Sequence, residues 1–306
     1  MRYRPARKLS LALAAAAALA AAVAACAASR PGDPPDQARY LGSYTWKNGS
    51  RWFGGLSALE VSGGGTSLTV LSDRAHLASA QVERGAAGAI TGVTLTGVHR
   101  LRGASGDPLG RGALDSEGLA LDPGGGFYVS FEGRARVARY DDEASPAKPL
   151  PRPREFRRMP RNKALEALAI SPEGHLYTMP ERALDKDRQI PVWRWDGRRW
   201  SQPFSLPPRD GFLPVGADFG PDGRFYLLER DFAYFGFRSR LRRWDITAQG
   251  PENETVLLQT GTGTHDNLEG LAVWRAADGS LRATMISDDN FTALQRTELV
   301  EYALPP

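Results

Sequence analysis

Alternating apolar and polar residues recur along this chain at a nearly constant spacing. The stretch EGLALDPGGGFYVSFE at 117–132 returns, altered, as EALAISPEGHLYTMPE at 166–181 and as VGADFGPDGRFYLLER at 215–230. A further copy opens with EGLAVW at 269–274, and a more distant one, GGLSALEVSGGGTSLTVLSDR, lies at 54–74. The last four copies begin 49, 49 and 54 residues apart. A period near fifty residues is typical of propellers and solenoids.

Each copy predicts a β-hairpin followed by two more strands. An apolar strand leads into a Pro/Gly turn such as DPGGG, SPEG or GPDG, and a strand rich in Phe, Tyr, Val and Leu follows. The further strand candidates are ARVARYD and REFRRMP after the copy at 117–132, PVWRWDG and RWSQPFSLP after 166–181, and SRLRRWDI and ETVLLQT after 215–230. Four antiparallel strands per repeat make up a propeller blade.

The expected fold is therefore all-β, a β-propeller of about five four-stranded blades at residues 39–306. The 63-residue step between the copies at 54 and 117 leaves room for six blades. Only one strand candidate, TELVEYAL, follows the last hairpin, so we expect ARYLGSYTW at 38–46 to complete that blade. Pairing the two ends of the chain would close the ring and remove exposed sheet edges.

Residues 1–26 predict a lipoprotein-type signal peptide. A basic start, MRYRPARK, precedes an apolar stretch that is too short to span a membrane. VAAC ends at Cys26, the single cysteine, and resembles the bacterial lipobox, in which the cysteine carries the lipid. We expect a lipid on Cys26, a flexible tether at 27–38 and export to the periplasmic side of the outer membrane. Cleavage as an ordinary signal peptide would instead give a soluble periplasmic protein.

The signal peptide also accounts for the net charge of the chain. Its four basic residues equal the whole formal charge of +4, and the remaining chain has 35 basic and 35 acidic residues. We therefore expect no nucleic-acid partner, and contact with a membrane only through the lipid anchor. The sequence leaves open whether the chain binds a protein partner.

Acidic residues occur in pairs at the open ends of three predicted hairpins. Residues equidistant from a turn lie opposite each other, which pairs Glu117 with Glu132, Glu166 with Glu181, and Glu269 with Asp288. Because the first strand of a blade lines the central channel, the leading glutamates should converge at one mouth of it. Converging carboxylates repel one another, and Ca²⁺, which binds six to eight oxygen ligands, would neutralise them. Alternatively, the same acids could cap turns or pair with adjacent arginines.

The copy at 215–230 has Val215 in the leading position and Arg230 in the trailing position. Arginine forks match the oxygens of phosphates and carboxylates, so we expect Arg230, with Arg74 and Arg182, to bind a small anionic substrate. His265 lies four residues before Glu269 and is expected to approach the same mouth. The predicted catalytic residues are Glu166, Arg230 and His265. An acid-held metal that activates water is the expected chemistry, because the chain has no G-x-S-x-G motif.

At these residues the chain resembles the bacterial phytase-like proteins, a family named for the esterase-like activity of phytase. The resemblance rests on SEGLA at 116–120, LEALA at 165–169, and HDNLEGLAV followed by SDDNF at 265–291. It implies a β-propeller with a calcium-supported phosphoester or ester hydrolase activity. By position, Glu117, Glu166 and Glu269 match the EGLA element, and Asp288, Asp289 and Asn290 match SDDN. The predicted metal ligands thus become Glu117, Glu166, Glu269, Asp288 and Asp289, and Asn290 joins the predicted substrate-binding residues.

Two other functions remain open on the sequence. Sugar-lactonase propellers also hold calcium with channel carboxylates. A non-catalytic propeller at the cell envelope could instead bind a protein, a glycan or a sugar phosphate through the aromatic residues of WRWDGRRW at 193–200 and DFAYFGF at 231–237. If those aromatic residues face the core, they would only pack the blades.

Overall fold

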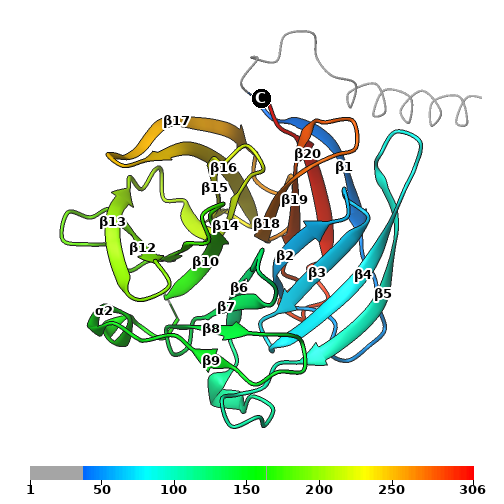
Figure 1. Ribbon diagram of the computed structural model, residues 1–306. Helices are drawn as coiled ribbons and strands as arrows, with labels where there is room; N and C mark the ends of the chain where they lie inside the picture. The colour runs from blue at the N-terminus through cyan, green and yellow to red at the C-terminus, as the bar shows by residue number, and fades with distance from the viewer. Residues whose placement is uncertain (1–36, 163) are drawn as a thin grey trace, which may run out of the picture.

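The computed structural model describes residues 37–162 and 164–306, which form five four-stranded antiparallel sheets arranged around a central axis (Figure 1). The predicted signal peptide, Cys26 and all but the end of the predicted tether lie outside the described residues. Among the described residues, no helix is long and apolar enough to cross a membrane. The β-propeller prediction is confirmed, with five blades.

Each blade contains four strands that follow one another from the channel outwards. Blade 1 consists of β2 (Leu56–Ser62), β3 (Ser67–Ser72), β4 (His76–Arg84) and β5 (Ile90–Arg100). Blade 2 consists of β6 (Ser116–Leu121), β7 (Phe127–Phe131), β8 (Arg136–Tyr140) and β9 (Lys148–Pro149). Blade 3 consists of β10 (Leu165–Ile170), β11 (Leu176–Pro180), β12 (Ile190–Trp195) and β13 (Trp200–Leu206).

Blade 4 consists of β14 (Leu213–Phe219), β15 (Phe225–Ala233), β16 (Gly236–Thr247) and β17 (Gly250–Gln259). Blade 5 consists of β18 (Leu268–Arg275), β19 (Leu281–Ser287), β20 (Glu298–Ala303) and β1 (Arg39–Thr45). The N-terminal strand β1 pairs with β20, with Arg39 opposite Ala303 and Thr45 opposite Glu298. The predicted closure of the ring is therefore confirmed.

The predicted fourth strand of blade 2, REFRRMP, is wrong. Its residues form the short helix α2 (Arg154–Arg158), and the two-residue strand β9 takes the outer position of the blade. Prolines explain the difference, because Pro149, Pro151 and Pro153 lack the N–H groups that a strand ladder needs. Pro153 directly precedes the helix, and Phe156 within it is buried against Trp193, with ring centroids 5.5 Å apart. The long step between blades 1 and 2 is a loop containing the 3₁₀ turn η1 (Arg111–Ala113).

The glycines of the repeat let neighbouring inner strands approach closely. A Cβ atom on Gly118 of β6 would lie 2.6 Å from the Cβ of Leu168 on β10, and one on Gly216 of β14 would lie 2.4 Å from the carbonyl oxygen of Glu269 on β18. Real Cβ atoms do not approach other heavy atoms this closely, so a side chain at either position would force the strands apart. Packing thus requires glycine at positions 118 and 216, whereas blades 1 and 3 have Ala58 and Ala167 at the equivalent position.

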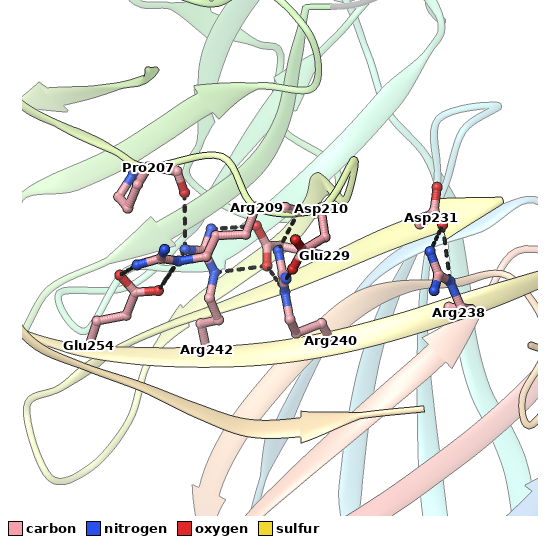
Figure 2. Close-up of polar contacts among 9 residues, drawn as sticks. All are labelled: Pro207, Arg209, Asp210, Glu229, Asp231, Arg238, Arg240, Arg242 and Glu254. Carbon is pink, nitrogen blue, oxygen red and sulfur yellow. Dashed lines mark hydrogen bonds and ion pairs between the residues drawn. The ribbon is translucent and has the colours of Figure 1, made fainter. Parts of the chain in front are cut away.

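A buried ion network joins blade 4 to the loop that leads into it (Figure 2). Glu229 accepts hydrogen bonds from the Nε atoms of Arg240 and Arg242, at 2.7 and 2.8 Å, and all three side chains are almost fully buried. Arg240 and Arg242 also donate to the carbonyl oxygens of Arg209 and Pro207 in the loop, at 2.9 and 3.0 Å. Two further carboxylates complete the network: Arg240 pairs with Asp210 at 3.2 Å, and Glu254 pairs with Arg242 at 3.1 Å and with Arg209 at 2.9 Å. Three arginines thus meet three carboxylates, so the network serves the fold.

Candidate functional site: the carboxylate mouth of the channel

The leading acids lie on β-bulges where the inner strands begin. The register between the first two strands of a blade shifts at the same point in all five blades, at Ser57, Glu117, Glu166, Val215 and Glu269. A bulge leaves its extra residue outside the hydrogen-bonded ladder and changes the direction of its side chain. In blades 2, 3 and 5 the bulged residue is a glutamate, whereas the buried Ser57 donates to the Ser116 carbonyl oxygen and Val215 packs in the hydrophobic core.

Three glutamates from blades 2 and 3 come within metal-binding distance of one another. One carboxylate oxygen from each of Glu132, Glu166 and Glu181 lies within 4.8 Å of the others. Glu132 and Glu181 follow the ends of β7 and β11, whereas Glu166 is the bulged residue of β10. Oxygen ligands lie about 2.3–2.6 Å from Ca²⁺, so two ligands of one ion are at most about 5 Å apart. This triad could therefore hold a metal ion.

Burial and mutual repulsion raise the pKa values of the mouth carboxyls. Burial is the main cause for Glu117 and Glu166, whose pKa values lie well above the usual range. Glu269 adds to the repulsion at Glu117, and Glu117 adds to it at Glu166. Burial, followed by repulsion from Glu269, raises the pKa of Asp288 to about 8, and burial raises that of Asp73 to about 6. The mouth thus holds more carboxyl groups than can all ionise together, and a bound cation would favour their ionised forms.

Arg230 is the cation that blade 4 contributes to the mouth. Its Nη1 atom donates to the Asn267 side-chain oxygen at 2.7 Å and contacts the Glu269 carboxylate, while Nη2 lies 3.4 Å from Glu181. Burial alone would lower the pKa of Arg230, but Glu269 and Glu166 outweigh it and raise this pKa above its usual value. Arg230 therefore acts as the internal counter-ion of the ring and links the triad to Glu269.

The predicted metal ligands lie at this mouth, but their contacts differ. Glu117 is close enough to Glu269 and Asp288 for their charges to raise its pKa. Asp289 accepts hydrogen bonds from the N–H groups of Gly55 and Phe291, both at 3.0 Å, and from the Thr297 hydroxyl at 3.1 Å. With both carboxylate oxygens occupied by these donors, Asp289 fixes the loop between β19 and β20.

The other predicted substrate-binding residues surround the mouth. Arg182 donates from Nε to Glu181 at 3.0 Å, and half of its side chain is exposed. The guanidinium of Arg74 lies 3.2 Å from the ring centroid of Phe291, a cation–π contact. Asn290 is exposed, and its backbone N–H donates to Asp288 at 2.7 Å.

His265 lies apart from the carboxylates. Its Nε2 atom is 2.8 Å from the Tyr302 hydroxyl on β20, the third strand of blade 5, and its ring centroid is 5.9 Å from that of Tyr40. Burial is the main cause that lowers the pKa of His265 below its usual value. Its surroundings are those of a packed, neutral imidazole.

Sequence reasoning placed Glu132 and Glu181 at the correct ends of their hairpins but did not include them among the ligands. The symmetry of the hairpins could have identified them as ligands, because it pairs each of them with a leading glutamate. Contact between blades, which joins Glu132 of blade 2 to Glu166 and Glu181 of blade 3, is not encoded in any single hairpin. Asp73 was also missed, since it lies in the least regular copy of the repeat.

The chain was also compared with known proteins. A sequence model of the phytase-like family, described as esterase-like activity of phytase, matches residues 51–291. The chain belongs to the phytase-like family. The match covers blades 1 to 4 of this phytase-like propeller and strands β18 and β19 of blade 5, and it includes Glu117, the triad, Arg230 and Asp288. No curated protein matches the chain.

Three solved structures are similar to this phytase-like chain. A luciferin-regenerating enzyme is 13% identical, with 82% of this chain and 80% of that chain covered and a TM-score of 0.43. The PQQ-bound form of an aldose sugar dehydrogenase from Streptomyces coelicolor is 14% identical, with 89% and 100% covered and a TM-score of 0.45. A protein of unknown function from Dyadobacter fermentans is 13% identical, with 81% and 76% covered and a TM-score of 0.44.

Proposed function

We propose that this phytase-like propeller is a calcium-dependent hydrolase of phosphoric or carboxylic esters, and that its active site is the carboxylate mouth. The observation that carries the proposal is the close approach of Glu132, Glu166 and Glu181, whose oxygens lie within 4.8 Å of one another. The donor set fits the ion, because carboxylate oxygens are the ligands that hard cations such as Ca²⁺ prefer.

A bound Ca²⁺ would supply Lewis-acid polarisation of an ester oxygen and a lowered pKa for water. The residues of the chain would do the rest. Arg230, held by Glu269 and Glu181, and the half-exposed Arg182 offer guanidinium N–H groups to an anionic substrate. Asp73 lies outside the triad, and a carboxyl with a pKa of about 6 is suited to accept a proton near neutral pH.

The test is a calorimetric Ca²⁺ titration of the wild-type protein and of Glu166→Gln, followed by assays of phosphate and carboxylate esters with and without a chelator. Glu143→Gln is the matched control, because Glu143 is an exposed residue in the loop after β8. We expect the wild type and Glu143→Gln to bind Ca²⁺ and to hydrolyse an ester, and Glu166→Gln to lose both properties. A wild type that does not bind Ca²⁺, or full activity in Glu166→Gln, would refute the proposal.

We also propose that the protein is exported and anchored through Cys26 to the periplasmic side of the outer membrane. The sequence of residues 1–26 supports this proposal, and the position of β1 adds a consequence. Arg39 pairs with Ala303, at the end of blade 5 opposite the mouth, so a tether that leads into β1 would let the mouth face away from the membrane. Labelling with a radioactive fatty acid should mark the wild type and leave Cys26→Ala unlabelled. Equal labelling would contradict the anchor.

One observation favours a second candidate function, a propeller that binds a partner at the envelope. At the turn between β15 and β16, Phe232, Tyr234 and Phe235 are 62%, 89% and 100% exposed. Trp193 and Trp195 are buried, so the expected packing role applies to them and the exposed hairpin is the surface left for recognition. Replacing the three exposed aromatics with serine should leave ester hydrolysis unchanged if the protein is an enzyme. A protein without hydrolytic activity that loses a glycan or protein ligand on this replacement would favour the binding propeller.

A further inference from the structure

The outer part of blade 2 carries a strongly basic stretch of chain. Residues 147–163, AKPLPRPREFRRMPRNK, contain seven arginines and lysines and one acid, Glu155. They run from β9 through α2 towards β10. Phe156 anchors the helix in the core, while four arginines around it are exposed: Arg154, Arg157, Arg158 and Arg161. The function proposed above uses none of these residues.

A cavity of about 250 Å³ lies beside this stretch, on the outer flank of blade 2. Arg134, Arg136 and Arg152 line it, and none of its described lining residues is an acid. Much of the remaining wall is apolar and includes Leu109 and Phe131. Arg136 belongs to β8, and the two inner strands β6 and β7 lie between β8 and the channel axis. The cavity is therefore distinct from the carboxylate mouth.

The backbone orients the guanidinium groups of this cavity. Arg136 stacks on Phe131, with its guanidinium carbon 3.7 Å from the ring centroid, and its Nη2 atom donates to the Ala113 carbonyl oxygen at 2.6 Å. Arg152 donates from Nε to the Ala135 carbonyl oxygen at 2.8 Å. A guanidinium has five N–H groups, so these bonds leave donors of both arginines for a ligand.

The arginines of the cavity also repel one another. Burial is the main cause that lowers the pKa of Arg136 to about 10, and the charges of Arg134 and Arg152 lower it further. Burial likewise lowers the pKa of Arg152, and Arg134 and Arg157 add to this effect. An anion between them would relieve the repulsion. The cavity and the exposed arginines form one surface, here called the basic flank, which consists of Arg134, Arg136, Arg152, Arg154, Arg157, Arg158 and Arg161.

The position of the basic flank in the ring distinguishes between anionic partners. Blade 5, which contains β1, packs between blades 1 and 4, so α2 and β1 lie on opposite sides of the ring (Figure 1). With the anchor proposed above, the tether would hold the side of β1 nearest to the membrane and turn the basic flank away from it. This position favours an acidic segment of a protein over anionic lipid headgroups.

We propose that the basic flank is a docking surface for an acidic segment of a partner protein, and that Arg136 and Arg152 bind one carboxylate of this segment in the cavity. Guanidinium forks bind carboxylates with paired hydrogen bonds, and the apolar wall would cover the methylene groups of the acidic side chain. The exposed arginines of α2 would meet further acids of the segment. The docking surface is independent of the proposed hydrolase, because neither the triad nor Arg230 belongs to it.

The test is fluorescence anisotropy of a labelled decaglutamate peptide titrated with the full chain at low and at physiological salt. Arg152→Gln changes the cavity, and the double variant Arg154→Gln, Arg157→Gln changes only exposed residues of α2. Arg198→Gln is the matched control, because Arg198 is an exposed arginine in the turn between β12 and β13. Vesicles of phosphatidylglycerol and duplex DNA test the other classes of anionic partner.

We expect the wild type and Arg198→Gln to bind the peptide, with an affinity that falls as salt is added. Arg152→Gln should bind at least about tenfold more weakly, the loss expected for a hydrogen bond between charged groups. The double variant, which leaves the core intact, should bind about fivefold more weakly. No binding of the peptide by the wild type, unchanged binding in both variants, or tighter binding of vesicles or DNA than of the peptide would overturn the proposal. Ca²⁺ binding and ester hydrolysis by the same variants should equal those of the wild type, so they test the proposed function separately.

Discussion

Replacing Asp288 with asparagine should stabilise the propeller when no metal is bound. Asp288 is buried, its pKa is raised from 3.8 to about 8, and its Oδ1 accepts the N–H of Asn290, a bond that an amide oxygen can keep. A carboxyl whose pKa is raised on folding binds its proton more tightly in the folded than in the unfolded state. Stability is therefore highest below the unfolded pKa and falls as the pH rises through the folded pKa.

The size of the effect follows from the two pKa values. At about pH 7 the unfolded chain has released this proton, whereas the folded chain retains it. This pH lies roughly three units above the unfolded pKa of 3.8, and each unit contributes about 1.36 kcal/mol. The carboxyl thus destabilises the folded state by about 4 kcal/mol at that pH, and by about 1.6 kcal/mol at pH 5. Asp288→Asn removes this penalty, so its advantage over the wild type should grow with pH across this interval.

Urea unfolding at several pH values with a chelator present would measure this difference. Asp278→Asn is the control, because Asp278 is exposed and its pKa is lowered, mainly by the Ser280 hydroxyl. Added Ca²⁺ should stabilise the wild type more than Asp288→Asn if this carboxylate faces the bound ion, since a ligand stabilises the form that binds it. A metal-free Asp288→Asn protein that is less stable than the wild type at pH 7, or equally pH-dependent, would refute the reasoning.

Three further predictions concern the scaffold. Glu229→Gln should lower the free energy of unfolding by about 3–5 kcal/mol in urea, because it removes the one buried carboxylate that Arg240 and Arg242 share and leaves them only Asp210 and Glu254; a loss below about 1 kcal/mol would contradict the role of this network. Gly216→Ala should lower the same quantity by about 1–3 kcal/mol, since its Cβ would meet a carbonyl oxygen 2.4 Å away, and wild-type thermal stability would argue against close approach of β14 and β18. Phe235→Ser should change stability by less than about 0.5 kcal/mol, because the side chain is fully exposed, whereas a large loss would mean that the hairpin packs against the body.

The sequence predicted the blades because each hairpin carries its own register. The Pro/Gly turns fix which residues lie opposite, so the strand assignments and the pairing of acids across a turn could be derived from local pattern alone. REFRRMP was assigned wrongly for a local reason as well, since its apolar residues Phe156 and Met159 lie three positions apart, a helical spacing, and the preceding prolines prevent strand pairing.

The candidate site was less predictable, because it depends on contacts between blades. Glu132 belongs to blade 2 and Glu181 to blade 3, and only the packing of the two sheets brings their oxygens together. The directions in which loop side chains point also could not be predicted from the sequence. His265 precedes Glu269 by four residues, yet its ring turns outward to Tyr302, while Asn267 between them turns inward to Arg230.

The five bulges explain how this fold can vary its chemistry without losing its architecture. Each bulged residue lies outside the ladder, so its side chain is not chosen by strand pairing, and the five positions indeed hold serine, glutamate, glutamate, valine and glutamate. The residue that follows in each case is glycine or alanine, which the close approach of the inner strands requires. Exchanging Val215 for glutamate would leave the strand ladder intact, but it would place a carboxyl in the apolar cluster that Val215 shares with Leu268 and Leu271, so it should also lower the free energy of unfolding. The added carboxylate would raise the pKa values of its neighbours, and would strengthen Ca²⁺ binding if this mouth holds the ion. Unchanged Ca²⁺ affinity in Val215→Glu, with the fold intact, would mean that the bulge of blade 4 does not face the metal.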